Sequence, residues 1–204
     1  IINDNPHKTI YFPDGEYLLA KPICTPADPR IAVSLELSCF AIIKAADGWD
    51  SPEALVRMGG IYPYNSISIP GSNYHFKGGI IDGNKIADAI SVENAGIVSL
   101  RYISIKGAVV GIHVKGDEQG RGPRADIHTV NIVGSLTLDS IGVLIESDGN
   151  TLTNMRIASN QIAIKLCSSD NFRRHLHPLY IFGSGFSEGY MESVAFYDEG
   201  TRNF

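Results

Sequence analysis

Histidine, arginine and aspartate recur at intervals in the second half of this chain of 204 residues. Such side chains, held close together, can serve general acid–base catalysis. The candidates for that chemistry are Arg101, Asp126, His128, Arg156 and His177. The candidates for holding a ligand by hydrogen bonds or ion pairs are Glu93, Arg121, Arg124, Asn131, Glu146, His175 and Tyr180. The first set is equally compatible with a polar binding face edged by aromatic rings, or with an ordinary solvated face.

A repeat sets the spacing of these residues. Four segments within residues 89–184 align so that apolar side chains fall into columns. Within each of the later columns, successive residues are 27, 25 and 24 positions apart in the sequence. Apolar residues at every second position predict two β-strands in each unit. A period in the twenties predicts a solenoid. The clearest columns are Ile90, Ile112, Val143 and Ile164; Leu100, Ile127, Leu152 and Leu176; and Ile105, Ile132, Ile157 and Ile181.

Glycine, serine and asparagine at the corners of each unit favour an all-β fold, a parallel β-helix with coils of about 21–31 residues. Leucine-rich repeats share the period, but their asparagine and leucine spacing is missing. Residues 116–124 and 135–139 are expected to be corner insertions. We expect one domain, with N-terminal coils over 1–87, regular coils over 88–184 and a final coil over 185–204. Residues 49–58 fit either a short helical turn or a loop.

Consecutive coils of such a fold lie about 4.8 Å apart, so outward residues of one column form a ladder. Glu93 and Glu146 are two coils apart, roughly 9–10 Å. That separation is near the upper limit, about 9.5 Å, for the carboxyl pair of an inverting glycosidase. Lys115 lies between them and would hold both carboxyls ionised. A structural charge ladder is therefore favoured, and His113 in the next column is expected to be an ordinary exposed histidine.

Composition narrows the classes of protein. The net charge is −5, which argues against a nucleic-acid partner. No apolar run approaches the roughly 20 residues of a membrane-spanning helix. The three cysteines, Cys24, Cys39 and Cys167, lack metal-ligand spacing, so no metal is expected. Only Cys24 and Cys39 are near enough in sequence to suggest a disulfide, and small core or corner residues are the favoured interpretation.

Residues 11–23 (YFPDGEYLLAKPI) resemble the opening coil of the pectate-lyase-like superfamily. In that superfamily a similar phrase follows an amphipathic helix that caps the β-helix, and residues 1–7 (IINDNPH) resemble the tail of that helix. The start of the chain suggests a mature or excised fragment. The resemblance implies a right-handed parallel β-helix, a polysaccharide partner and an extracellular, cell-surface or virion-associated location. The Asp-Asp, Gly-His-Gly and Arg-x-Lys motifs of polygalacturonases and the clustered aspartates that hold calcium in pectate lyases are missing. No catalytic residue and no cofactor is therefore carried over, and calcium is unsupported.

The leading expectation is a polysaccharide hydrolase or lyase acting on an extended glycan along the outer face of the coils. The alternatives are a non-catalytic, tailspike-like or adhesin domain that binds glycan, and a structural shaft that trimerises or packs end to end. An enzyme should contain a titratable pair with shifted pKa values. A glycan binder should expose aromatic rings along a ladder. The tyrosines available for this are Tyr62, Tyr64, Tyr74, Tyr180 and Tyr190.

Overall fold

The computed structural model describes residues 2–60, 73–93, 97–116, 122–134, 137–147, 149–167, 179–187 and 194–199. Their strands form three parallel sheets of seven strands each. Sheet A contains β1 (Thr9–Phe12), β4 (Ser34–Leu37), β7 (Asn73–Lys77), β10 (Ile97–Arg101), β13 (Arg124–His128), β16 (Thr151–Thr153) and β19 (Tyr180–Phe182). Sheet B contains β2 (Gly15–Leu19), β5 (Ala41–Ala45), β8 (Ile80–Asp82), β11 (Ser104–Lys106), β14 (Asn131–Val133), β17 (Arg156–Ala158) and β20 (Gly185–Ser187). Sheet C contains β3 (Ile23–Cys24), β6 (Val56–Met58), β9 (Ile90–Val92), β12 (Val110–Val114), β15 (Ile141–Ile145), β18 (Ile162–Cys167) and β21 (Val194–Glu199).

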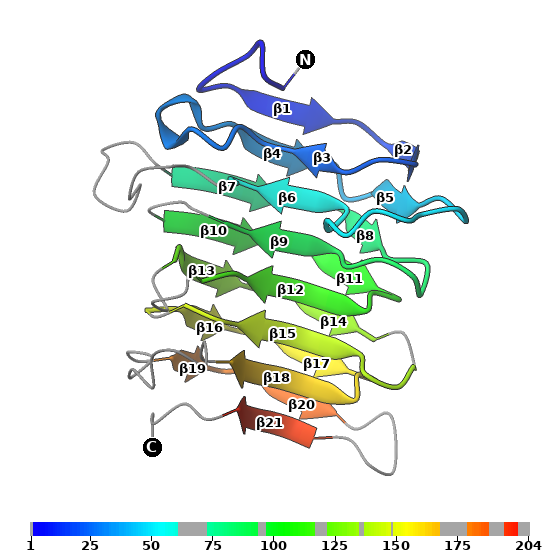
Figure 1. Ribbon diagram of the computed structural model, residues 1–204, viewed down its shortest axis with the longest axis vertical. Coiled ribbons are helices and arrows are strands. Elements are labelled where there is room, and N and C mark those ends of the chain that lie inside the picture. The colour runs from blue at the N-terminus through cyan, green and yellow to red at the C-terminus, as the bar shows by residue number, and fades with distance from the viewer. Residues whose placement is uncertain are drawn as a thin grey trace.

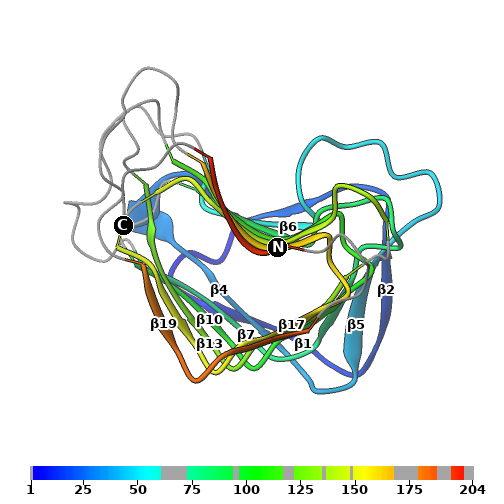
Figure 2. The same ribbon diagram turned by 90° about the horizontal axis from the view of Figure 1, so that it is seen from below.

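The chain winds as a right-handed parallel β-helix, and this confirms the predicted fold class. Each coil gives one strand to sheet A, one to sheet B and one to sheet C, so a repeat contains three strands where the alternation predicted two. The coils stack from the N-terminus to the C-terminus along the long axis (Figure 1). Seen along that axis, the three sheets enclose one interior (Figure 2). A 3-10 turn, η1 (Pro29–Ile31), joins β3 to β4.

The core consists of the columns that the repeat predicted. Ile112 pairs with Ile90 on one side and with Val143 on the other, and all three are fully buried. Leu100 and Ile127 occupy the equivalent buried positions of sheet A. Burying such a side chain completely contributes roughly 1.5–3 kcal/mol. Because each inward residue lies on its counterpart in the next coil, the core is continuous along the axis.

The last coil is out of step with the predicted alignment. Leu152 pairs with Ile181, which was expected beside Ile157. Phe186 occupies the position beside Ile157 instead. Leu176, the predicted partner of Leu152, is outside the described residues. The prediction was wrong because several apolar residues follow β18, and a corner between coils can take extra residues without disturbing the core on either side.

At five successive corners between sheets A and B, from β7–β8 to β19–β20, the residue directly after the strand of sheet A has a left-handed backbone. The φ angles are 82° at Gly78, 57° at Tyr102, 54° at Thr129, 52° at Asn154 and 55° at Gly183. Glycine takes this conformation freely and asparagine tolerates it, whereas a β-branched threonine is an outlier. The residue recurs in these five coils, whereas the residues after β1 and β4, Pro13 and Ser38, are not left-handed.

Several local predictions are corrected or settled by the structure. Residues 49–58 form no helix; they make a loop that leads into β6, and Ser51 Oγ accepts a hydrogen bond of 3.1 Å from the Glu53 N–H. Residues 2–8 form turns and not the tail of a helix. Arg124 begins β13 and does not lie in a corner insertion. No disulfide joins any two of Cys24, Cys39 and Cys167, all of which the structure describes. In the described ranges, no helix has the length and apolar character needed to cross a membrane.

Close stacking leaves no room for a side chain at Gly83. A Cβ there would lie 2.5 Å from Ala108 Cα and 2.6 Å from Ala87 O. We expect Gly83→Ala to lower the free energy of unfolding by about 1–3 kcal/mol, because backbone must move to accept the methyl group. Gly48→Ala is the matched control, since a Cβ at Gly48 meets nothing within 4 Å. Denaturant unfolding of both variants tests this, and equal free energies would contradict it.

Candidate functional site

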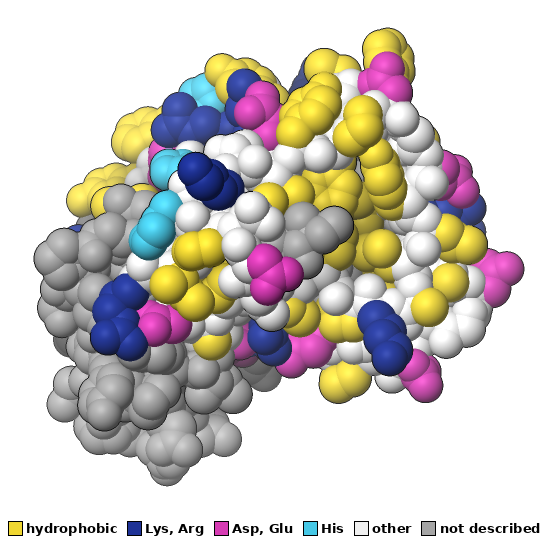
Figure 3. Space-filling model, turned by 90° about the horizontal axis from the view of Figure 1, so that it is seen from above, with side chains coloured by type: hydrophobic (Ala, Val, Ile, Leu, Met, Phe, Trp, Pro, Cys, Tyr) yellow, Lys and Arg dark blue, Asp and Glu magenta, His cyan; other side chains and the backbone are white. Residues whose placement is uncertain are grey.

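The outer face of sheet A carries two columns of side chains along seven coils, at a rise of about 4.8 Å per coil and so over about 29 Å. We call this surface the sheet A face. One column contains Thr9, Ser34, His75, Ser99, Asp126, Thr151 and Tyr180. The other contains Tyr11, Glu36, Lys77, Arg101, His128, Thr153 and Phe182. Figure 3 shows histidine side chains gathered on one side of the molecule, with some of the lysine and arginine side chains beside them.

Arg101 links two coils at the centre of this face. Its Nη2 lies 2.6 Å from Asp126 Oδ2, and its Nε donates a hydrogen bond of 2.8 Å to Ser99 Oγ. The Arg101 and Asp126 side chains are 47% and 37% exposed, so the pair contributes at most about 1 kcal/mol to stability. The bonds fix the guanidinium plane while both partners remain open to solvent.

His128 is oriented by the corner next to it. Its Nδ1 lies 2.8 Å from Thr129 Oγ1, and that oxygen also accepts a hydrogen bond of 3.1 Å from Asn154 Nδ2 in the next coil. The ring of Tyr102 packs edge-on against the imidazole, with the centroids 6.2 Å apart. Since Nδ1 is engaged, Nε2 is the nitrogen that can meet a ligand. The sequence analysis missed Tyr102, Thr129 and Asn154, although they recur directly after the outward strand positions.

The structure brings five of the candidate residues onto strands of sheet A: Arg101, Arg124, Asp126, His128 and Tyr180. Tyr180 pairs with Thr151, which is a correction, because the predicted alignment of Ile181 with Ile157 would have placed Tyr180 beside Arg156. Asn131 and Arg156 pair with each other on sheet B, around the corner. The remaining candidates, Arg121, His175 and His177, lie outside the described residues.

Two carboxylates close enough for glycoside hydrolysis do not occur on the described part of the sheet A face. Its acidic side chains there are Glu36 and Asp126, and β7 and β10 separate their strands. Three coil steps correspond to about 14 Å. The carboxyl groups of inverting enzymes are at most about 9.5 Å apart, and those of retaining enzymes are closer.

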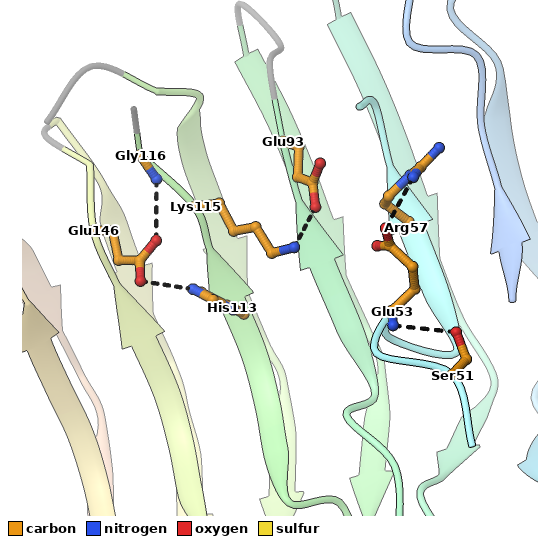
Figure 4. Close-up of polar contacts among 8 residues, drawn as sticks. All are labelled: Ser51, Glu53, Arg57, Glu93, His113, Lys115, Gly116 and Glu146. Atoms are coloured by element: carbon orange, nitrogen blue, oxygen red, sulfur yellow. Dashed lines mark hydrogen bonds and ion pairs between the residues drawn. The ribbon is translucent and has the colours of Figure 1, made fainter. Parts of the chain in front are cut away.

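The outer face of sheet C, the sheet C face, carries charges that are paired with one another (Figure 4). Lys115 Nζ lies 2.5 Å from Glu93 Oε1, and His113 Nε2 lies 3.2 Å from Glu146 Oε1. In the preceding coil, Arg57 Nη1 lies 3.2 Å from Glu53 Oε1. The favoured charge ladder is therefore present. Its pairing differs from the expected one, in which Lys115 lay between both glutamates: Lys115 pairs with Glu93, and His113 pairs with Glu146.

The pKa of Glu146 follows from this pairing. Burial raises it, but the hydrogen bond and charge of His113, the Gly116 N–H and the charge of Lys115 together outweigh burial and lower the pKa. Glu146 is thus held in its ionised form, which cannot donate a proton as an acid catalyst. Glu93 faces the ammonium group of Lys115 at ion-pair distance. Glu146 therefore does not supply the acid of the carboxyl pair that a hydrolase requires.

Asp88 is the other carboxyl with a shifted pKa on this side of the molecule. Burial raises its pKa, against the lowering effects of the Val110 N–H, His113 and Lys115. Asp88 precedes Glu93 by five residues along an extended segment, which corresponds to about 16 Å. The backbone positions of the two residues are thus well separated along the chain.

In the parts of the chain that the structure describes, we looked for side chains that could hold a metal ion and for a reactive cysteine. No group of three or more histidine, cysteine, aspartate or glutamate side chains there could hold a metal ion. Burial raises the pKa of the Cys24 thiol, although the charge of Arg57 lowers it. Cys24 is therefore a neutral thiol and not a reactive thiolate.

The tyrosines that were candidates for stacking on a sugar differ in their exposure to solvent. Tyr74 is fully buried, and its hydroxyl donates a hydrogen bond of 2.6 Å to Pro26 O, so it cannot stack on a ligand. Tyr180 is exposed on the sheet A face. Tyr62, Tyr64 and Tyr190 lie outside the described residues. Two rings that were not singled out, Tyr11 and Phe182, are exposed at the two ends of one column.

The lowered pKa of Glu146 predicts how stability changes with acid. The folded pKa lies below the usual value of 4.5, so the carboxylate stabilises the fold above pH 4.5. That contribution is lost as the pH falls through the folded pKa. We expect Glu146→Gln to be less stable than wild type at pH 7 and the difference to shrink below pH 4.5. Urea unfolding at several pH values measures this, with the exposed pair member changed in Glu36→Gln as control. A difference that stays constant down to pH 3 would refute the assignment.

Comparisons of this chain with models of known protein families, with curated proteins and with solved structures find no match. The parallel β-helix is shown by the topology of the three sheets. Any statement about function therefore depends on the two faces described above.

Proposed function

We propose that this protein binds an extended glycan along the sheet A face. The supporting observation is a solvated face on which polar side chains of consecutive coils contact one another while exposed aromatic rings stand at both ends. Arg101 offers donors, Asp126 offers acceptors and His128 offers Nε2. A sugar ring presents hydroxyl groups that both donate and accept, so such a mixture of groups suits it.

The geometry of the coil favours a polymer over a small molecule. Outward positions repeat at about 4.8 Å along the axis, so a ligand with repeating units meets repeating contacts. The rings of Tyr11 and Phe182 offer faces on which the C–H side of a sugar can pack. The net charge of −5 disfavours nucleic acid as the polymer.

The opening stretch supports membership of the pectate-lyase-like superfamily, which we include in the proposal. Residues 11–23 build strands of all three sheets in the first coil. Tyr17 holds the corner there, since its hydroxyl donates a hydrogen bond of 2.9 Å to Pro13 O and its ring packs edge-on against Phe12. A polysaccharide partner and an extracellular, cell-surface or virion-associated location follow from that membership.

Hydrolase or lyase activity, the leading expectation from the sequence, stays a prediction. On the described faces, the carboxyl groups are either too far apart or held by ion pairs, and this favours binding without cleavage. Arg101 is paired with Asp126, and Arg156 lies on another sheet, so the two arginines do not converge as a lyase site would need.

Affinity electrophoresis through gels containing single acidic or neutral polysaccharides tests the binding proposal. We expect at least one polysaccharide to retard the wild-type protein and Arg101→Gln to weaken that binding about tenfold, equivalent to about 1.4 kcal/mol. The control is Lys106→Gln, which removes the exposed member of an ion pair of 3.1 Å with Asp82 on sheet B. Equal weakening by both variants would show that the sheet A face is not the binding face.

Incubating the wild-type protein with the same polysaccharides also tests for cleavage. New reducing ends without unsaturated products would identify a hydrolase, and unsaturated uronates would identify a lyase. Either result would replace the binding proposal by an enzymatic one. Retardation without any product would support it, and absence of retardation by every polysaccharide would refute it.

A further inference from the structure

We infer that Tyr180 and Phe182 form an aromatic subsite that stacks on a pyranose ring at the C-terminal end of the sheet A face. This inference rests on the proposed function and names the part of the ligand that the subsite takes. The two side chains are 49% and 55% exposed. Their ring planes are nearly parallel, 6° apart, with centroids separated by 6.2 Å.

The register assigns the inner and outer sides of β19. Ile181, between the two rings in sequence, pairs with the buried Leu152 and continues that core column at the end of sheet A, where Ile181 is itself 37% exposed. Tyr180 and Phe182 therefore point outward by the alternation of a strand. Burying a large apolar side chain contributes roughly 1.5–3 kcal/mol, so two adjacent rings left in solvent mark a contact surface.

The rings continue the polar columns. Tyr180 follows Asp126 and Thr151 in one column, and Phe182 follows His128 and Thr153 in the other. The two threonines are small and half-buried, so no large side chain stands between the rings and the polar groups along these columns. The rings are two coils from Asp126 and His128, about 10 Å. One short oligosaccharide can therefore contact both parts at once.

The neighbours of the rings favour a sugar over an apolar protein surface. A pyranose has hydroxyl groups at its rim and C–H groups on its faces, so it packs on an aromatic ring while its rim forms hydrogen bonds. Asp126, His128 and the Tyr180 hydroxyl supply such bonds within two coils. An apolar protein partner would leave these polar groups desolvated without partners, which is costly.

Calorimetric titration with cellohexaose and with hexagalacturonate tests the subsite. For whichever probe the wild type binds, we expect Tyr180→Ala and Phe182→Ala each to weaken binding about tenfold and Phe182→Tyr to retain it. The matched control is Tyr197→Ala, which removes a ring 43% exposed on sheet C of the same coil. We expect that control to leave affinity unchanged.

The outcomes separate the subsite from the proposed function. If Arg101→Gln weakens binding and both ring variants bind normally, the subsite is wrong and the function stands. If the wild type binds neither probe and no polysaccharide in the gel screen, both the subsite and the proposed function are refuted. Should an alanine variant fail to fold, Tyr180→Leu and Phe182→Leu keep apolar area without a flat ring, and unchanged affinity would then refute stacking. Concentration-dependent association of the wild type that is lost in the ring variants, without an effect on glycan affinity, would assign the rings to a protein partner.

Discussion

Parallel pairing between coils is the constraint on which the rest of this molecule depends. It fixes a rise of about 4.8 Å per coil and makes each residue face the same side as its partner in the next coil. Inward positions must therefore be apolar in every coil, as Ile90, Ile112 and Val143 are. Outward positions are free of that demand. Any chemistry on the surface is consequently arranged as ladders, and distances along a ladder come in multiples of the rise.

The corners turn the chain from one sheet to the next while the strands of successive coils stay stacked in register. At five of the corners between sheets A and B the residue directly after the strand of sheet A is left-handed, even where it is Tyr102 or Thr129. Such a conformation costs roughly 1–2 kcal/mol for a residue other than glycine. Its backbone remains bonded, since the N–H of each of these residues reaches the carbonyl of the next coil. The turn also places Thr129 and Asn154 against His128, so one corner both closes the coil and orients a surface side chain.

The fold was predictable because the core residues recur in the sequence as columns of Ile, Val and Leu, and several columns share the same spacing between successive residues. The site was predictable only in part. Asp126 and Arg101 were found because the register places them in neighbouring columns of adjacent coils, although Arg101 pairs in register with His128 and reaches Asp126 diagonally. Tyr180 was misplaced because the sequence after β18 does not show where β19 begins. The pairing of Glu146 with His113 was missed because it depends on how far side chains reach across coils, which the register does not determine.

The two faces use the same ladder geometry with opposite consequences for binding. On the sheet C face the Glu93 carboxylate is nearly buried against Lys115. Removing one partner of a buried pair costs about 3–5 kcal/mol, so a ligand would gain little by competing for it. On the sheet A face Arg101 and Asp126 are solvated, and separating them costs at most about 1 kcal/mol. A ligand can therefore recruit their donors and acceptors at low cost, and for this reason the exposed ladder is the better candidate for binding.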